Sequence, residues 1–346
     1  MGKDVMHMPL KNRYKVLPKI EVSHKQFGRW PLTEEISQHP LMMNDSRPWP
    51  RVSIVTPSYN QGQFLEETIR SVLLQGYPNL EYFVIDGGST DKSREIIKKY
   101  EPWLSGWVSE KDCGQSHAIN KGVKLSTGEF WAWLNSDDIY MPGTIFKCVK
   151  ALQENSKVAM VYGDGLWINE DSVPKQIYKG GPLNTISLLT GSTGNAIPQA
   201  TAFMRREALK NVGGLNEKLH MAMDYDLWIK LSFNSDLEYL PGPPLAGVRG
   251  HQDMKSVKYQ LQAYLEHLQA LKEGCRHPLC SHRVTPFRNQ EYIKVYFGVA
   301  RNYLEKNMWL KALPYLLRAV INAGFFYSMI KLFKRLNRKY HQQKRL

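Results

Sequence analysis

Short apolar runs alternate with amphipathic stretches from residue 51 to residue 163, and a polar turn follows each run. The runs predict buried strands, and apolar positions that repeat every three or four residues predict helices between them. The expected strands cover residues 52–56, 80–85, 107–108, 130–134 and 158–162, and the expected helices cover residues 64–73, a segment ending near 100, 115–124 and 143–153. This alternation predicts an α/β fold with a mostly parallel sheet and right-handed crossovers.

The pattern is less regular after residue 163. Residues 164–200 hold scattered Gly and Pro without periodicity, which predicts a long binding loop. Strands are expected at 201–204 and 237–240, helices at 206–212 and 224–233, and an antiparallel helix pair at 292–304 and 310–323. The predicted organisation is an N-terminal extension over 1–50, a sheet domain over 51–254 and a helical region over 255–346.

Positive charge is concentrated near the C-terminus of this chain of 346 residues, whose net charge is +14. Lys and Arg minus Asp and Glu give +3 for residues 1–50, −2 for 51–250 and +13 for 251–346. Residues 331–346 contain seven Lys or Arg and no acid, next to bulky apolar residues. This tail predicts contact with an anionic membrane surface. The alternative is a solvated terminal helix that packs on the domain, and no motif indicates nucleic acid as a partner.

The composition is that of an ordinary globular protein, with 42% hydrophobic and 23% charged residues. Four cysteines do not make a disulfide scaffold, which favours a reducing compartment. The N-terminus lacks the apolar core of a signal peptide, and no window of about 20 residues is both apolar and uncharged. We therefore expect a cytoplasmic protein that is peripheral on the inner face of the membrane.

Two adjacent carboxylates, Asp137 and Asp138, follow the apolar run at 130–134. Ligands of open α/β sheets bind beyond the carboxyl ends of the strands, so this pair is expected at a site. Paired acids there suit Mg²⁺ or Mn²⁺ carrying a diphosphate, and the alternative is the N-cap of a helix. No glycine-rich dinucleotide or P-loop motif follows the first strand, which argues against those two nucleotide sites.

Four motifs together resemble the family-2 glycosyltransferases with the GT-A fold, in order and rough spacing over about residues 51–252. They are Val-Ser-Ile-Val-Thr-Pro-Ser-Tyr-Asn at 52–60, Val-Ile-Asp-Gly-Gly-Ser-Thr-Asp at 84–91, Asn-Ser-Asp-Asp at 135–138 and Met-Asp-Tyr-Asp-Leu-Trp at 223–228. The resemblance implies a nucleotide-sugar donor, Mg²⁺ or Mn²⁺ as cofactor, and inversion at the anomeric carbon.

The resemblance also implies roles for individual residues. Those expected to line the nucleotide pocket are Thr56, Pro57, Tyr59, Asn60, Asp86, Lys111 and Gln115, with Asp86 accepting a hydrogen bond from the base. Asp137 is expected near the ribose and the metal, Asp138 is expected to bind the metal directly, and His251 to contact metal or phosphate.

Asp224 matches the family's general base. A sugar hydroxyl is a poor nucleophile until a carboxylate takes its proton, so the chemistry needs such a group. The alternative for Asp224 is a first-turn acid that stabilises its helix. Asp226, two residues along, points elsewhere on a helix and is expected to be structural. Gln199 is a candidate acceptor contact, with a plain loop residue as the alternative.

The sequence therefore predicts an inverting, metal-dependent glycosyltransferase of the hexosyltransferase type, acting on a glycan or a lipid-linked acceptor in cell-surface polysaccharide synthesis. A sugar nucleotidyltransferase is a second hypothesis, but Thr56–Asn60 lacks the glycine-rich basic loop that it would need. A third is a non-catalytic protein that binds a sugar nucleotide or a polysaccharide.

Overall fold

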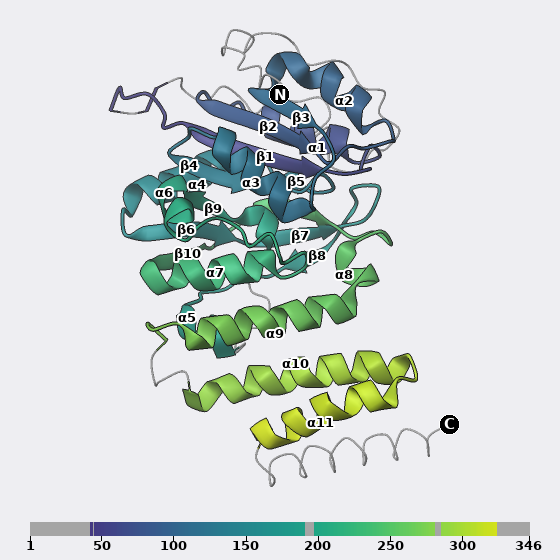
Figure 1. Ribbon diagram of the computed structural model, residues 1–346. Coiled ribbons are helices and arrows are strands. Elements are labelled where there is room, and N and C mark those ends of the chain that lie inside the picture. The colour runs from purple at the N-terminus through teal and green to yellow at the C-terminus, as the bar shows by residue number, and fades with distance from the viewer. Residues whose placement is uncertain (1–41, 44, 191–196, 281–284, 324–346) are drawn as a thin grey trace.

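A seven-stranded sheet crosses the computed structural model, with strand order β10-β6-β9-β4-β1-β2-β3 (Figure 1). The structure describes residues 42–43, 45–190, 197–280 and 285–323. The strands are β1 (Val52–Ser58), β2 (Leu80–Asp86), β3 (Gly106–Ser109), β4 (Phe130–Trp133), β6 (Val158–Gly163), β9 (Phe203–Arg205) and β10 (Asp236–Leu240). Only β9 runs antiparallel to its neighbours in this sheet, β4 and β6. The predicted mostly parallel sheet is confirmed.

Helices cover both faces of this sheet, because successive residues of its central strands are buried on opposite sides. In β4, Phe130 and Ala132 join the cluster under α1 (Leu65–Leu73), α2 (Ser93–Tyr100) and α4 (Thr144–Glu154). Trp131 and Trp133 join the cluster under α3 (Gln115–Leu125), α6 (Arg206–Asn211) and α7 (Met223–Asn234). The expectation that this run forms a buried strand is confirmed, and the strand is buried on both faces.

A second sheet of four strands contradicts the prediction of an unstructured loop over 164–200. Its order is β5-β11-β7-β8, from β5 (Ile139–Tyr140), β11 (Ala246–Arg249), β7 (Gly165–Ile168) and β8 (Pro174–Tyr178). A short helix, α5 (Thr185–Thr190), follows. The sequence hides β8 because four of its five residues are exposed. Pairing with β7 rather than burial holds this strand, so it carries no apolar pattern.

The described chain is helical from residue 255 onward, as the pattern predicts. The helices are α8 (Lys255–Lys258), α9 (Gln260–Arg276), α10 (Thr285–Glu305) and α11 (Trp309–Ala323). Figure 1 shows α9, α10 and α11 stacked in succession below α7. No helix in the described ranges is long and apolar enough to cross a membrane. The basic tail over 324–346 and most of the extension over 1–50 lie outside the described residues.

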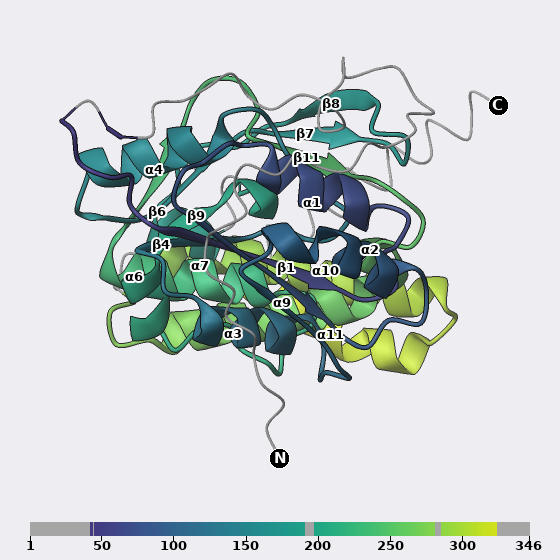
Figure 2. The same cartoon turned by 90° about the horizontal axis from the view of Figure 1, so that it is seen from above.

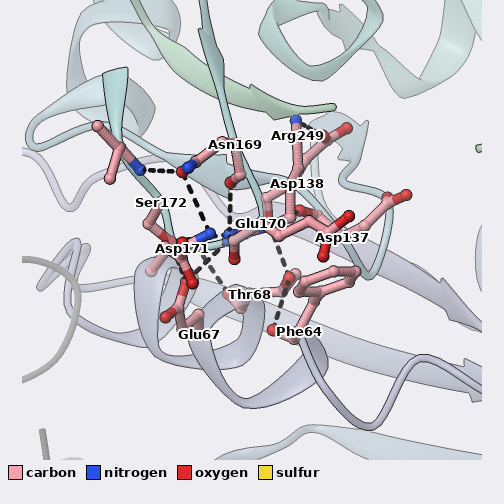
Figure 3. A network of polar contacts seen from close by, with 12 residues as sticks. Phe64, Glu67, Thr68, Asp137, Asp138, Asn169, Glu170, Asp171, Ser172 and Arg249 are labelled. Carbon is pink, nitrogen blue, oxygen red and sulfur yellow. Dashed lines mark hydrogen bonds and ion pairs between the residues drawn. The ribbon is translucent and has the colours of Figure 1, made fainter. Parts of the chain in front are cut away.

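Arg249, the last residue of β11, is the most connected side chain near the carboxyl ends of the strands (Figure 3). It is 1% exposed, and its Nη2 lies 2.7 Å from Glu67 Oε2 of α1. Its Nε donates to the carbonyl oxygen of Asp137 at 2.8 Å. Its Nη1 donates into the β7–β8 turn, to the carbonyl oxygens of Asn169 and Glu170 and to the hydroxyl of Ser172.

The backbone of Arg249 contacts the acidic turn that follows β4. Its amide donates to Asp138 Oδ1 at 2.9 Å, and Thr68 Oγ1 of α1 donates to the carbonyl oxygen of Asp138 at 2.8 Å. The Phe64 ring lies 4.7 Å from the guanidinium. One cation therefore joins α1, the acidic turn after β4, the β7–β8 turn and β11. In Figure 2, α1 lies beside β7 and β11, so the joined segments are also neighbours in space.

Replacing Arg249 with Met is expected to lower the free energy of unfolding by about 3–5 kcal/mol, because the change breaks the ion pair of a buried guanidinium with Glu67 and removes the donor of several carbonyl oxygens. Urea unfolding followed by circular dichroism measures the change. Arg47→Met is the matched control, since Arg47 pairs with Asp45 on the exposed surface. Equal stability of the two variants would contradict the central role of Arg249.

Candidate active site

The carboxyl ends of β1, β2 and β4 meet at one edge of the large sheet, and the predicted motifs lie there together. Ser58 at the end of β1 is in register with Asp86, and Asp86 is in register with Ser109 of β3. The amide of Leu134, just past β4, donates to the carbonyl oxygen of Val55. Parallel pairing thus collects segments that are distant in sequence into one site.

Asp86 has its carboxylate engaged by its own loop and by β3. It accepts hydrogen bonds from the amides of Gly88 and Ser89 at 3.2 and 2.9 Å, and from the hydroxyls of Ser89 and Ser109 at 2.5 and 2.6 Å. The side chain is almost fully buried. In this structure Asp86 shapes the turn after β2.

The other residues expected on the nucleotide side differ in exposure. Thr56 and Pro57 are buried, and Thr56 Oγ1 lies 3.0 Å from Tyr82 Oη. Tyr59 is exposed, as is Lys111, whose backbone lies against Gly88. Asn60 adopts a left-handed conformation with φ of 53°, and its Oδ1 accepts from the amide of Thr90 at 2.8 Å. Tyr59 and Lys111 are thus accessible to a ligand, whereas Thr56 is part of the buried core below the loop.

The two adjacent acids have different surroundings. Asp137 Oδ2 lies 3.0 Å from His251 Nε2, and its side chain is partly open to solvent. Asp138 is 5% exposed and accepts from the Arg249 amide. Burial, together with the negative charge of Asp137, raises the pKa of Asp138 well above its ordinary value. Of the two, Asp137 is the acid that faces the open site.

A chain of amide side chains runs beside these acids. Gln115 at the start of α3 donates to Asn135 Oδ1 at 2.7 Å, and Asn135 donates to Gln199 Oε1 at 3.0 Å. Gln199 in turn donates to the carbonyl oxygen of Trp133 at 3.0 Å. Lys255 Nζ of α8 closes the chain by donating to Gln115 Oε1 at 2.9 Å. The structure therefore brings Gln115 and Gln199 together around the end of β4.

Sequence reasoning missed Asn135 and Lys255. The only local signal for Asn135 was its place two residues before the acid pair. Lys255 carried no signal, because it lies among the many cations after residue 250 and its neighbour Gln115 is 140 residues away.

Asp224 lies in the first turn of α7, where its carboxylate can also interact with the helix dipole. Its Oδ1 accepts from the amide of Tyr225 at 2.7 Å, and within the described part of the chain its side chain makes no other hydrogen bond. Burial raises the pKa of Asp224. Its negative charge, with burial as the larger cause, raises the pKa of nearby Tyr178 to about 12. Asp226 instead pairs with Lys230 at 2.6 Å.

Among the described residues, no three His, Cys, Asp or Glu side chains are grouped so that they could hold a metal ion by themselves. Two do converge, since Asp137 and His251 face each other. His251 is buried, and its Nδ1 has no hydrogen-bond partner in the described ranges. Mg²⁺ is usually bound through one or two protein ligands together with substrate phosphates, so a pair is enough for a donor-bound metal.

Known proteins match this chain in sequence. The model of the family described as Glycosyl transferase family 2 matches residues 53–213. An uncharacterized glycosyltransferase of Rickettsia typhi is 31% identical over 268 residues, which cover 71% of this chain and 83% of that protein. An uncharacterized glycosyltransferase of Rickettsia conorii is 34% identical over 189 residues, which cover 52% of this chain and only 31% of that protein.

Solved structures match the fold. S. aureus TarS in complex with UDP-GlcNAc has a TM-score of 0.60 at 20% identity, over 78% of this chain and 81% of that one. Mannosyltransferase PcManGT from Pyrobaculum calidifontis, in complex with GDP-Man and Mn²⁺, has a TM-score of 0.56 at 17% identity, over 83% and 80%. These likenesses establish the GT-A fold that the motifs predict. The chain belongs to glycosyl transferase family 2 and is a glycosyltransferase.

Proposed function

We propose that this enzyme inverts the anomeric carbon of its donor in a single displacement, with Asp224 as the general base. The observation that carries this proposal is the state of Asp224. Its carboxylate is half-buried, has a raised pKa and is bonded only to the next amide in the chain, within the described residues. A base needs such a free oxygen and a proton affinity nearer to neutral pH than that of an ordinary Asp.

In the proposed reaction the acceptor hydroxyl oxygen attacks the anomeric carbon while the bond from that carbon to the diphosphate oxygen breaks. Asp224 takes the hydroxyl proton during the attack. The nucleoside diphosphate leaves from the opposite face with the electron pair of the broken bond. No covalent sugar–enzyme intermediate forms, so the reaction needs no Ser or Cys nucleophile.

Asp137 and His251 are the proposed protein ligands of the metal, which revises the expectation that Asp138 binds it directly. The Asp138 carboxylate accepts from the Arg249 amide and has little exposure, whereas Asp137 is open to the site. A bound Mg²⁺ or Mn²⁺ would neutralise charge on the departing diphosphate. Asp138 would then position the acidic turn. PcManGT, which shares the fold, was solved with Mn²⁺.

Tyr59, Asn60 and Lys111 are the proposed contacts for the nucleotide, because they surround the turn at Gly88 where the backbone of two loops comes close. Lys255 is proposed to meet the diphosphate, since its ammonium group is held by Gln115 on the side of Asp137. An ammonium group there adds a positive charge for the leaving group. Gln199 would act by holding Asn135 and the end of β4.

The test uses purified protein with UDP-, GDP- and dTDP-sugars, with Mn²⁺ or with EDTA, and measures the release of nucleoside diphosphate. Metal-dependent release from one donor is expected. Asp224→Asn should retain donor binding and lose at least about 100-fold in turnover, the usual contribution of a general base. Asp226→Asn is the matched control, since that acid already pairs with Lys230. Full turnover by the Asp224 variant would exclude this residue as the base.

The two acids of the turn can be separated by calorimetry of donor binding with and without Mn²⁺. Asp137→Asn is expected to lose more than about tenfold in metal-dependent affinity, because a direct ligand should cost at least as much as an outer-shell partner. Asp138→Asn keeps an oxygen for the Arg249 amide and should change that affinity far less. The reverse order would restore Asp138 as the ligand.

The proposed acceptor is a hydroxyl of a glycan or of a lipid-linked acceptor. A lipid-linked acceptor would place the enzyme at the inner face of the membrane. The outer face of α11 supports this placement. Leu310, Leu313, Leu317 and Ile321 lie on one side of the helix, with exposures from 52% to 88%. Lys272, Arg276 and Arg318, together with one carboxylate, line a groove beside it, between α9 and α11, so the charge of the groove is positive on balance.

An anionic bilayer fits this face better than a second copy of the chain. A two-fold contact would bring the same three cations together, which costs free energy, whereas lipid phosphates would neutralise them. The apolar side chains of α11 would enter the interfacial region of the bilayer. The basic sequence of residues 331–346 continues the same charge.

Flotation with phosphatidylcholine vesicles, with or without phosphatidylglycerol, tests this placement. The full chain should bind the anionic vesicles, and Leu313→Glu/Leu317→Glu should bind them at least about tenfold more weakly. Leu279→Glu, at an exposed position outside α11, is the control. If the double variant binds like the wild type, the face of α11 is not the contact. If the wild type forms a dimer and the double variant does not, a second copy of the chain is the partner of this face.

A further inference from the structure

Glu266 of α9 is a buried carboxylate that no part of the proposed reaction uses. It is 7% exposed, and its Oε2 accepts from three consecutive backbone amides, those of His220, Met221 and Ala222, at 2.7, 2.6 and 3.2 Å. Its Oε1 accepts from Gln262 at 2.7 Å. Both carboxylate oxygens are therefore engaged, mostly by the backbone of a single short segment.

That segment is the lead into α7, the helix that carries Asp224. The N-cap residue Ala222 has no side chain that could bond the free amides at this helix end. Glu266 supplies an oxygen from a different helix to the three amides that lead into α7, and adds a negative charge near the positive end of the α7 dipole. The amides just before Met223 are thus bonded by a residue of the helical region, 44 to 46 positions later in the sequence.

The same segment touches the nucleotide side of the site. Gly114, which precedes α3, has φ of 113°, and a Cβ there would lie 3.0 Å from His220 Nδ1. Ser116 Oγ of α3 donates to the carbonyl oxygen of Leu219 at 2.8 Å. The segment over 219–222 therefore lies between the start of α3, where Gln115 bonds Asn135, and the start of α7.

A second contact from the helical region holds the residue after Asp224. The imidazole of His267, next to Glu266 in α9, stacks on the ring of Tyr225 at 4.1 Å with an angle of 9° between the planes. His267 Nε2 lies 3.2 Å from Glu291 Oε1 of α10, which fixes the ring. The hydroxyl of Tyr225 donates to the carbonyl oxygen of Leu188 at 2.7 Å. Tyr225 is thus held at both its ring and its hydroxyl.

We propose that Glu266 is a positioning residue for the general base, assisted by the His267–Glu291 pair, so that the helices after residue 255 are part of the catalytic unit. Glu266 fixes the backbone from His220 to Ala222, and His267 fixes Tyr225, on either side of the turn that presents Asp224. A displacement of about 1 Å at a reacting group can cost about 100-fold in rate. The inference depends on the role of Asp224 proposed above.

The charged and titratable groups around Asp224 agree with this arrangement. His267 of α9 is the charged side chain whose electrostatic influence is resolved at Asp224, and Asp224 in turn acts on Tyr178 of β8. Protonated His267 would lower the pKa of Asp224, opposing the effect of burial. Glu291 of α10 faces His267 from its other side and is itself paired with Lys294.

The test measures turnover, donor KM and the pH profile of the full chain. Glu266→Ala is expected to lower kcat by about 10- to 100-fold and to change donor KM much less, because Glu266 bonds the lead into α7 directly and meets the nucleotide side only through that segment. Glu266→Gln keeps an acceptor for the amides and should recover at least half of that loss on a logarithmic scale. Glu273→Ala is the control, since Glu273 lies on the same helix and bonds only to Gln269 there.

His267→Phe keeps the stack on Tyr225 and removes both the bond to Glu291 and the charge. It should shift the acidic limb of the kcat profile upward in pH and change its maximum less than Glu266→Ala does. If Glu266→Ala unfolds, Glu266→Gln and His267→Phe still decide the matter. Unchanged kcat and pH profile in both would overturn the inference. Turnover by Asp224→Asn would instead defeat the proposed base, so the two failures are distinguishable.

Discussion

The buried guanidinium of Arg249 is the constraint on which the rest of the site depends. Two carboxylates follow β4, and the site can hold them close together only if a cation and several amides compensate their charge. Arg249 provides its side chain to Glu67 and to the acidic turn, and its backbone amide to Asp138. The small second sheet contains β11 and so positions Arg249 beside this turn.

The same constraint gives the two acids different tasks. Asp138 is drawn inward by the Arg249 amide and by the contact of its own carbonyl oxygen with Thr68. Asp137 is left outward, where His251 meets it. His251 follows Arg249 by only two residues. The end of β11 therefore supplies both the buried guanidinium of Arg249 and the imidazole that contacts Asp137. The geometry of β11 thus connects the stability of the turn with the two proposed metal ligands, Asp137 and His251.

Local sequence patterns predicted the parts of this fold that depend on local burial. The two-sided burial of β4 was evident because Phe130–Trp133 is apolar at every position, and the helices of the sheet domain were evident from their spacing. The strands β7 and β8 were missed because they are held by pairing with each other and with β11. Lys255 and Glu266 were missed for a similar reason, since their partners are 140 and about 45 residues away.

Motif comparison identified Asp224, but only the structure shows why this acid differs from its neighbours. Asp86 is saturated by four donors, Asp138 is bound by a backbone amide, and Asp226 is paired with Lys230. The carboxylate of each is therefore already bonded to other groups of the fold. Within the described residues, Asp224 has one amide as its only hydrogen-bond donor. Burial destabilises its charged form and raises its pKa. A raised pKa and a carboxylate with few partners are what the proposed role as general base requires.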